Sequence, residues 1–130
     1  MNNFLLILAG GGLGSYLRYF VAQWAADRFG PAFPFGTLFV NLGGCFLIGL
    51  IAGLPLGAGS LTPRMRLLFM TGFLGGLTTF SSYEYESFML AHDGALPRAL
   101  LNLGGSVVAG FIAVVAGFLL MRTLAQLVKS

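Results

Sequence analysis

Long uncharged, apolar runs constrain this chain more than any other feature. Seven basic and four acidic residues are its only charged positions, and they leave four charge-free stretches, at residues 1–17, 29–63, 67–83 and 99–121. A membrane-spanning helix needs about 20 mostly apolar residues. Charged residues form 8% of the chain, against about 25% in an average soluble domain, which is too few to cover a surface in water. The sequence therefore predicts an integral membrane protein and excludes a water-soluble fold, a disordered chain and a nucleic-acid-binding module.

Three short segments rich in glycine and proline separate the apolar runs. They lie at residues 30–34, 55–63 and 92–97, where these residue types favour turns over helix. We predict transmembrane helices at about residues 4–26, 37–56, 66–90 and 98–122. These helices nearly exhaust the 130 residues. The predicted fold class is therefore an all-α integral membrane protein with four transmembrane helices, a single domain over residues 1–130 and no room for a soluble catalytic domain.

The basic residues give only a weak signal for orientation in the membrane. With four spans, one side would carry Arg64, Arg66, Arg122 and Lys129, and the other side would carry Arg28 and Arg98. The positive-inside rule counts such residues near the helix ends. A bias of four against two is compatible with insertion in both orientations, and also with a single orientation that has a cytoplasmic N-terminus.

Glycines four residues apart mark the faces on which helices can pack closely. Small residues at this spacing let helix backbones approach each other in lipid. The chain has three such pairs in its predicted helices: Gly10/Gly14, Gly49/Gly53 and Gly72/Gly76. We expect most of these glycines to serve helix packing.

The polar residues do not form a catalytic or metal-binding set. Cys45 and His92 are each the only residue of their kind, so a disulfide within the chain and a thiolate cluster are excluded. Polar groups in lipid are costly and need a reason, but most of those within the predicted helices are hydroxyls and amides. The carboxylates Glu84 and Glu86 lack a partner base, because Arg18 does not give up its proton. The sequence argues against an enzyme.

The third predicted helix contains a segment poorly suited to a helix. Residues 72–83 read GFLGGLTTFSSY, so three glycines precede two threonines, and both residue types lower helix propensity. A break at this depth frees backbone carbonyls, which must be buried in protein or satisfied by a ligand, and a hard monovalent cation suits such oxygens. A kink whose loose groups are capped by the threonine hydroxyls is the alternative.

Two aromatic residues follow this segment. Phe80 and Tyr83 stand three residues apart and therefore share a helical face. Aromatic rings have a positive edge, so ring edges beside amide and hydroxyl donors could hold a small anion without a full positive charge. Such weak binding suits a pore, which an ion must leave as well as enter. Ordinary aromatic packing is the alternative.

Three motifs occur in one order along nearly the whole chain: residues 11–19 (GGLGSYLRY), residues 36–44 (GTLFVNLGG) and residues 72–83 (GFLGGLTTFSSY). Together they resemble the Fluc (CrcB-type) family of fluoride channels. The resemblance implies an antiparallel, dual-topology homodimer of four-helix subunits in the lipid bilayer, with two fluoride pathways along the interface. It also implies a structural sodium ion at the dimer centre, which is not transported and which the main-chain carbonyls of Gly75 and Thr78 hold.

The resemblance also assigns residues to the fluoride pathway. The matching positions are Asn41, Phe80, Tyr83, Ser106 and Asn102, with Ser81 and Ser82 as further hydroxyl donors and with Arg18 and Glu86 at the polar ends. Tyr83 is a departure, since it stands where the family has a second phenylalanine. Asn102 is another, since it stands where many relatives have tyrosine.

The predicted function is a passive, fluoride-selective ion channel in a bacterial inner membrane, which lets toxic cytoplasmic fluoride leak out. The alternative is a proton-coupled exporter of small cations of the small multidrug-resistance type, which also forms antiparallel dimers of short chains. Such an exporter needs a carboxylate embedded in the membrane, whereas Glu84 and Glu86 lie near the end of the third helix. A structural subunit without transport would leave Asn41 and the pair Phe80 and Tyr83 without a purpose.

Overall fold

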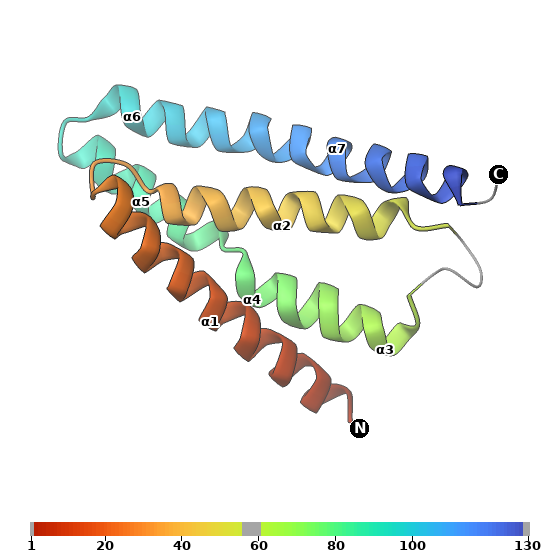
Figure 1. The fold of residues 1–130 in the computed structure, drawn as a ribbon. Helices are drawn as coiled ribbons and strands as arrows, with labels where there is room; N and C mark the ends of the chain where they lie inside the picture. Colours follow the sequence, from red (N-terminus) through yellow and green to blue (C-terminus); the bar gives the residue numbers. More distant parts are fainter. Residues whose placement is uncertain (1, 56–60, 129–130) are drawn as a thin grey trace.

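The structure, a computed structural model, describes residues 2–55 and 61–128. Within these ranges every regular element is a helix (Figure 1). In the described part of the chain, three helical runs are long and apolar enough to cross a membrane: α1 (Asn3–Phe29), α2 (Phe35–Gly53), and the continuous run of α6 (Leu96–Leu100), the π-helical η2 (Leu101–Gly105) and α7 (Ser106–Leu127). The prediction of an all-helical fold is confirmed for the described residues, and these three runs fit a membrane protein.

The third apolar segment is divided into two helical parts. The elements are α3 (Pro63–Arg66), the π-helical η1 (Leu67–Leu74), α4 (Gly75–Leu77) and, after the break, α5 (Phe80–His92). Thr78 and Thr79 between them are extended, with φ/ψ angles of −86°/155° and −152°/122°. The predicted break in the third helix is confirmed, and helical residues lie on both sides of it, from Pro63 to Leu77 and from Phe80 to His92. The threonines form the break because β-branched residues favour extended backbone, while the glycines before it stay helical.

The other helices end a few residues away from their predicted ends. α1 continues beyond residue 26 to Phe29 and stops at Gly30, whose φ of 76° favours glycine. α2 begins at Phe35 instead of residue 37 and ends at Gly53. Its end follows from Pro55, because a residue before proline avoids the helical region, and Leu54 has ψ of 138°. The last helical run extends from Leu96 to Leu127, beyond both predicted ends.

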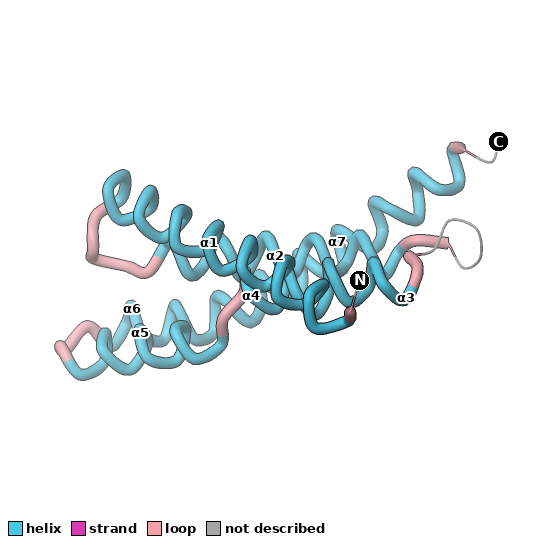
Figure 2. Tube along the Cα trace, turned by 90° about the horizontal axis from the view of Figure 1, so that it is seen from below, coloured by secondary structure: helices cyan, strands magenta, loops and turns pink. Residues whose placement is uncertain are grey.

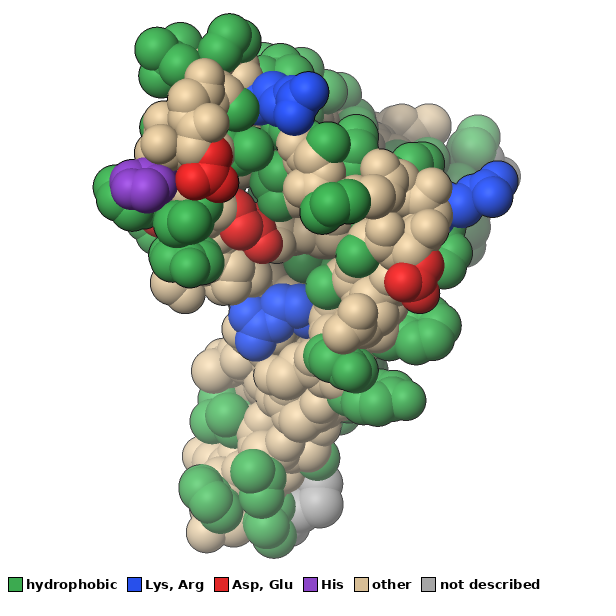
Figure 3. Space-filling model, turned by 90° about the vertical axis from the view of Figure 1, so that its left-hand side faces the viewer, with side chains coloured by type: hydrophobic (Ala, Val, Ile, Leu, Met, Phe, Trp, Pro, Cys, Tyr) green, Lys and Arg blue, Asp and Glu red, His purple; other side chains and the backbone are tan. Residues whose placement is uncertain are grey.

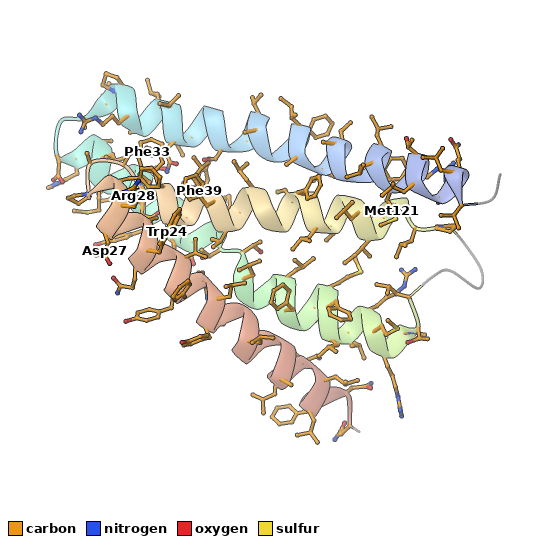
Figure 4. All side chains as sticks on the ribbon, viewed as in Figure 1. Trp24, Asp27, Arg28, Phe33, Phe39 and Met121 are labelled. Carbon is orange, nitrogen blue, oxygen red and sulfur yellow. The ribbon has the colours of Figure 1, made fainter. Side chains whose placement is uncertain are left out.

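Aromatic packing explains the longer α1 and the earlier start of α2. Figure 4 shows Trp24, Phe33 and Phe39 at the end of the molecule where α1 meets α2. Phe29 lies among them, with its ring centroid 5.8 Å from that of Trp24 and 5.1 Å from that of Phe35. Aromatic pairs of this kind contribute about 0.5–1.5 kcal/mol each beyond their burial, which favours helix up to the turn.

The predicted glycine faces are confirmed as close contacts between helices. α1 packs on η1 and α4, and α2 packs along α7 (Figure 1). A Cβ atom at Gly14 would meet the main-chain oxygen of Phe73, and one at Gly49 would meet that of Val114. These glycines remain helical because their bare faces let the backbones touch, which outweighs their low helix propensity of about 1 kcal/mol.

One chain alone leaves most of its apolar side chains uncovered. Its core is small and centres on Val40, Leu74 and Leu77, whereas Phe80 and Phe111 are each 72% exposed. The face in Figure 3 carries a few charged groups among many apolar ones, and Figure 2 shows α1 and α5 diverging towards one end of the molecule. Lipid or a further chain must cover such surfaces, since water does not favour them.

Two glycines on α1 provide a matched test of this packing. Gly14→Ala should destabilise the protein by about 1–3 kcal/mol, the usual cost of forcing an extra group into a packed interior, because its Cβ would collide with the Phe73 backbone. Gly12→Ala should be neutral or stabilising, since nothing lies within 4 Å of a Cβ there. Thermal unfolding in detergent measures both; equal melting temperatures for the two variants would contradict the packing.

Candidate functional site

The break in the third segment is closed by a side chain from another helix. Asn41 on α2 accepts a hydrogen bond from the Thr79 N–H at 2.8 Å and donates one to the Thr79 carbonyl at 3.0 Å. One planar amide therefore satisfies both main-chain groups of the extended residue. This pairing uses one of the two N–H groups that an asparagine side chain carries.

Threonine hydroxyls bond main-chain groups on both sides of the break. The Thr78 hydroxyl donates to the Leu74 carbonyl at 2.9 Å. The Thr79 hydroxyl accepts from the Ser82 main-chain N–H at 3.3 Å and so caps α5. The Leu74 carbonyl also accepts from the Thr78 main-chain N–H at 3.0 Å, so only the Thr79 hydroxyl caps a main-chain group that the break leaves free.

These side-chain bonds also take donors away from two carbonyls. In a continuous helix the Gly75 carbonyl would accept from the N–H of Thr79, and the Thr78 carbonyl from that of Ser82. The first N–H is given to Asn41 and the second to the Thr79 hydroxyl. Gly75 and Thr78 are the two residues whose carbonyls the resemblance assigned to a cation, and Gly75 is exposed on the surface of the single chain.

A cleft of about 380 Å³ lies beside the break. Its polar and aromatic lining consists of Asn41, Thr78, Thr79, Phe80, Tyr83 and Ser106. The rings of Phe80 and Tyr83 lie 5.6 Å apart between centroids and are tilted by 42°, so the predicted aromatic pair is present at the cleft. Phe80 projects outward, while Tyr83 is 7% exposed and donates its hydroxyl to the Leu103 carbonyl at 2.8 Å.

The remaining predicted pathway residues lie around this cleft without lining it. The hydroxyls of Ser81 and Ser82 lie 3.4 and 3.1 Å from that of Thr79. Asn102 is buried, at 2% exposure, and hydrogen-bonds Ser87 and Ser106. The cleft thus brings together Asn41, Phe80, Tyr83 and Ser106, and Asn102 reaches it through Ser106.

Glu86 and Arg18, predicted at the polar ends, have different surroundings. Glu86 accepts a hydrogen bond from the Thr37 hydroxyl at 2.7 Å, and both residues line a second cavity of about 340 Å³ between α1, α2 and α5. The other carboxylate oxygen of Glu86, Oε2, is buried and has no hydrogen-bond partner among the residues described. Arg18 is half-buried on α1 and lines neither cavity.

Sequence reasoning missed Ser87, which supports the site: it is 2% exposed and bonds Asn102. Thr37, a polar residue one turn before Asn41 on α2, holds Glu86. A signal for Ser87 was present, because it stands four residues after Tyr83 and so on the same helical face. In the part of the chain that the structure describes, no three residues among His, Cys, Asp and Glu come close enough together to bind a metal.

The fold and the cleft define a class: a small all-helical membrane protein with a broken segment beside a polar cavity. The chain belongs to the family described as CrcB-like protein, Camphor Resistance (CrcB), which matches residues 5–118. The family resemblance read from the three sequence motifs is therefore confirmed.

Similar proteins from three bacteria match almost end to end. The one from Rhizobium meliloti (strain 1021) is 46% identical over 124 residues, which are 95% of this chain and 99% of the relative. The one from Chloroflexus aurantiacus (strain J-10-fl) is 48% identical, with 90% and 93% covered, and the one from Maridesulfovibrio salexigens is 43% identical, with 94% and 97% covered. Each of these three proteins is named Fluoride-specific ion channel FluC.

Replacing Asn41 tests whether it holds the break. Asn41→Leu should lower stability by about 2 kcal/mol, because unpaired buried main-chain groups cost about 1–3 kcal/mol, and it should speed amide exchange at Thr79 and its neighbours. Cys45→Ala, one turn further along α2, should leave that exchange unchanged. Hydrogen-exchange mass spectrometry measures both variants, and unaltered protection of the break in Asn41→Leu would contradict the role.

Proposed function

We propose that this protein is a passive, fluoride-selective ion channel and not an enzyme. The observation that carries the proposal is the cleft beside the break, which joins the amide of Asn41, the hydroxyl of Ser106 and the ring of Phe80. Fluoride is small and strongly hydrated, so a pathway through a membrane must replace its water with other donors. Neutral donors and ring edges do this without the strong binding that would keep the ion from leaving. The name of the three relatives supports fluoride as the permeating ion.

The channel would be an antiparallel homodimer of four-span subunits. The third segment would supply the remaining span. Its two parts, the run from α3 to α4 and helix α5, would cross the membrane together, because a crossing needs about 20 residues and neither part is that long. Two observations favour a second copy: Gly75 and Phe80 at the break are exposed in one chain, and the weak bias of basic residues permits both orientations. An antiparallel partner would place a second break opposite the first.

A sodium ion on the dimer axis would stabilise the dimer and would not be transported. The carbonyls of Gly75 and Thr78 have lost their ordinary helical donors to side chains, and such oxygens suit a hard cation. Two copies would contribute two pairs of carbonyls. The ion would hold the breaks of the two subunits together.

The protein would lie in the inner membrane of a bacterium as a multi-pass protein, where it lets cytoplasmic fluoride leak out. The bacterial sources of the relatives support this location. In a proton-coupled exporter, transport would depend on a pH gradient. In a channel, fluoride efflux would be electrogenic and would respond to the membrane voltage.

Fluoride efflux from liposomes tests the function and the role of Phe80. With a potassium ionophore present, the wild-type protein should release fluoride rapidly and leave chloride inside. Phe80→Ile keeps bulk but removes the ring edge, and should slow efflux at least tenfold, which is about 1.4 kcal/mol at the barrier. Phe111→Ile is the matched control, since Phe111 is equally exposed and lies outside the cleft. Near-normal efflux in Phe80→Ile would remove the ring from the pathway, and efflux that requires a pH gradient would favour the exporter.

A leucine at Gly75 tests the dimer and its cation. Within one chain a Cβ at Gly75 meets only the Met70 carbonyl oxygen, at an ordinary 3.9 Å, so Gly75→Leu should leave the subunit folded. It should separate the dimer and abolish efflux by crowding the partner's backbone. Light scattering on detergent-solubilised protein measures the mass, with Gly12→Leu as the control. A Gly75→Leu protein that remains fully dimeric would argue against the cation site. So would a wild-type protein whose fluoride flux and dimer mass stay the same when sodium is exchanged for a large organic cation.

A further inference from the structure

Four polar groups next to the cleft form a chain of hydrogen bonds between α5 and the start of the last helical run. The Ser106 hydroxyl donates to Asn102 Oδ1 at 3.2 Å, Asn102 Nδ2 donates to the Ser87 hydroxyl at 2.9 Å, and that hydroxyl donates to the Tyr83 carbonyl at 2.7 Å. Asn102 and Ser87 are each 2% exposed. Of the three side chains in this chain of bonds, only that of Ser106 belongs to a residue that lines the cleft.

The chain of bonds has one direction, and the Tyr83 carbonyl sets it. A carbonyl accepts and cannot donate, so the single proton of the Ser87 hydroxyl points to it. Ser87 must then accept from Asn102, which orients the amide with its nitrogen towards Ser87 and its oxygen towards Ser106. As a result, the Ser106 proton points to Asn102 and away from the cleft.

The weakest bond of the chain is the one nearest to the cleft. At 3.2 Å, the bond from Ser106 to Asn102 is the longest of the three, so it is the first to yield. When Ser106 turns its proton towards an anion, Asn102 Oδ1 is left buried without this donor, which has a cost in free energy. The Ser106 hydroxyl can therefore donate to a passing anion, and it returns to Asn102 Oδ1 when the anion leaves.

We propose that Ser87 and Asn102 are positioning residues that make the Ser106 hydroxyl a retractable donor for the permeating anion. The proposal rests on the proposed channel function. It adds Ser87 to the site and has Asn102 act through Ser106 instead of touching the ion. Its consequence is weak, reversible coordination of fluoride at Ser106, which favours fast passage over tight binding.

The Tyr83 hydroxyl supports the same arrangement. It donates at 2.8 Å to the carbonyl of Leu103, which follows Asn102 within the π-helical η2. Tyr83 thereby ties α5 to the turn that carries Asn102, while its own carbonyl receives the Ser87 proton. Tyr83 and Asn102 are thus connected in one network.

The experiment measures fluoride current in planar bilayers against fluoride concentration. In Ser87→Ala the Asn102 amide loses the partner that fixes its direction, so its N–H can turn to Ser106 and leave the Ser106 proton free for the ion. The concentration that gives half-maximal current should fall about threefold or more, since one hydrogen bond no longer opposes binding, and the maximal current should decrease. Thr123→Ala, which removes an exposed hydroxyl bonded to the Leu119 carbonyl on the same helical run, should change neither.

The deciding comparison is made in a second background. If Ser87 acts through Ser106, then adding Ser87→Ala to Ser106→Ala should produce no further shift of the half-maximal concentration. A shift of the same size in both backgrounds, or none in the single variant, would overturn the proposal. Asn102→Leu, tested in the same two backgrounds, decides the question if Ser87→Ala fails to assemble. A wild-type protein without fluoride current would instead refute the channel function itself.

Discussion

The two hydrogen bonds between Asn41 and Thr79 are the interaction on which the rest of the structure depends. A helix that stops inside an apolar segment exposes N–H and C=O groups for which lipid offers no partner. A single amide resolves this, because it binds both main-chain groups of Thr79, at 2.8 and 3.0 Å. With the break stabilised, α5 starts anew at Phe80 and brings the aromatic pair to the cleft. The carbonyls of Gly75 and Thr78 are released by the same rearrangement.

Close packing at glycines explains why Asn41 reaches the break. Gly44 on α2 lies directly against the Thr78 methyl group, and a Cβ at that position would collide with it. On the other side, Gly14 and Gly76 hold α1 against the helical part that precedes the break. The glycines that weaken helix propensity are therefore the residues that fix the helices around the break, since backbones in lipid gain stability from direct contact.

Neutral groups dominate the cleft, and their donors are shared with the protein. Asn41 is engaged with Thr79, and the Ser106 hydroxyl with Asn102. A donor that already has an internal partner binds an ion less tightly than a free one, because the ion must compete with that partner. Hydrogen bonds that hold the fold thus also limit how strongly an anion is held. Glu86, a carboxylate on the same helix α5, is held by Thr37 in a separate cavity.

The sequence by itself determined that the protein is surrounded by lipid, that its fold is helical, which helix faces pack, and that one helix is broken. These follow from local properties: sparse charges, glycines at a spacing of four, and adjacent β-branched threonines. It also placed Phe80 and Tyr83 on one face, since their spacing of three needs only helix geometry. Only the tertiary structure decided that Asn41 closes the break from 38 positions away, that the glycines stay helical, and that Ser87 lies beneath Asn102. Contacts between helices depend on how far each helix is rotated and shifted against its neighbour, and this is set by the packing of the whole chain rather than by any local run of residues.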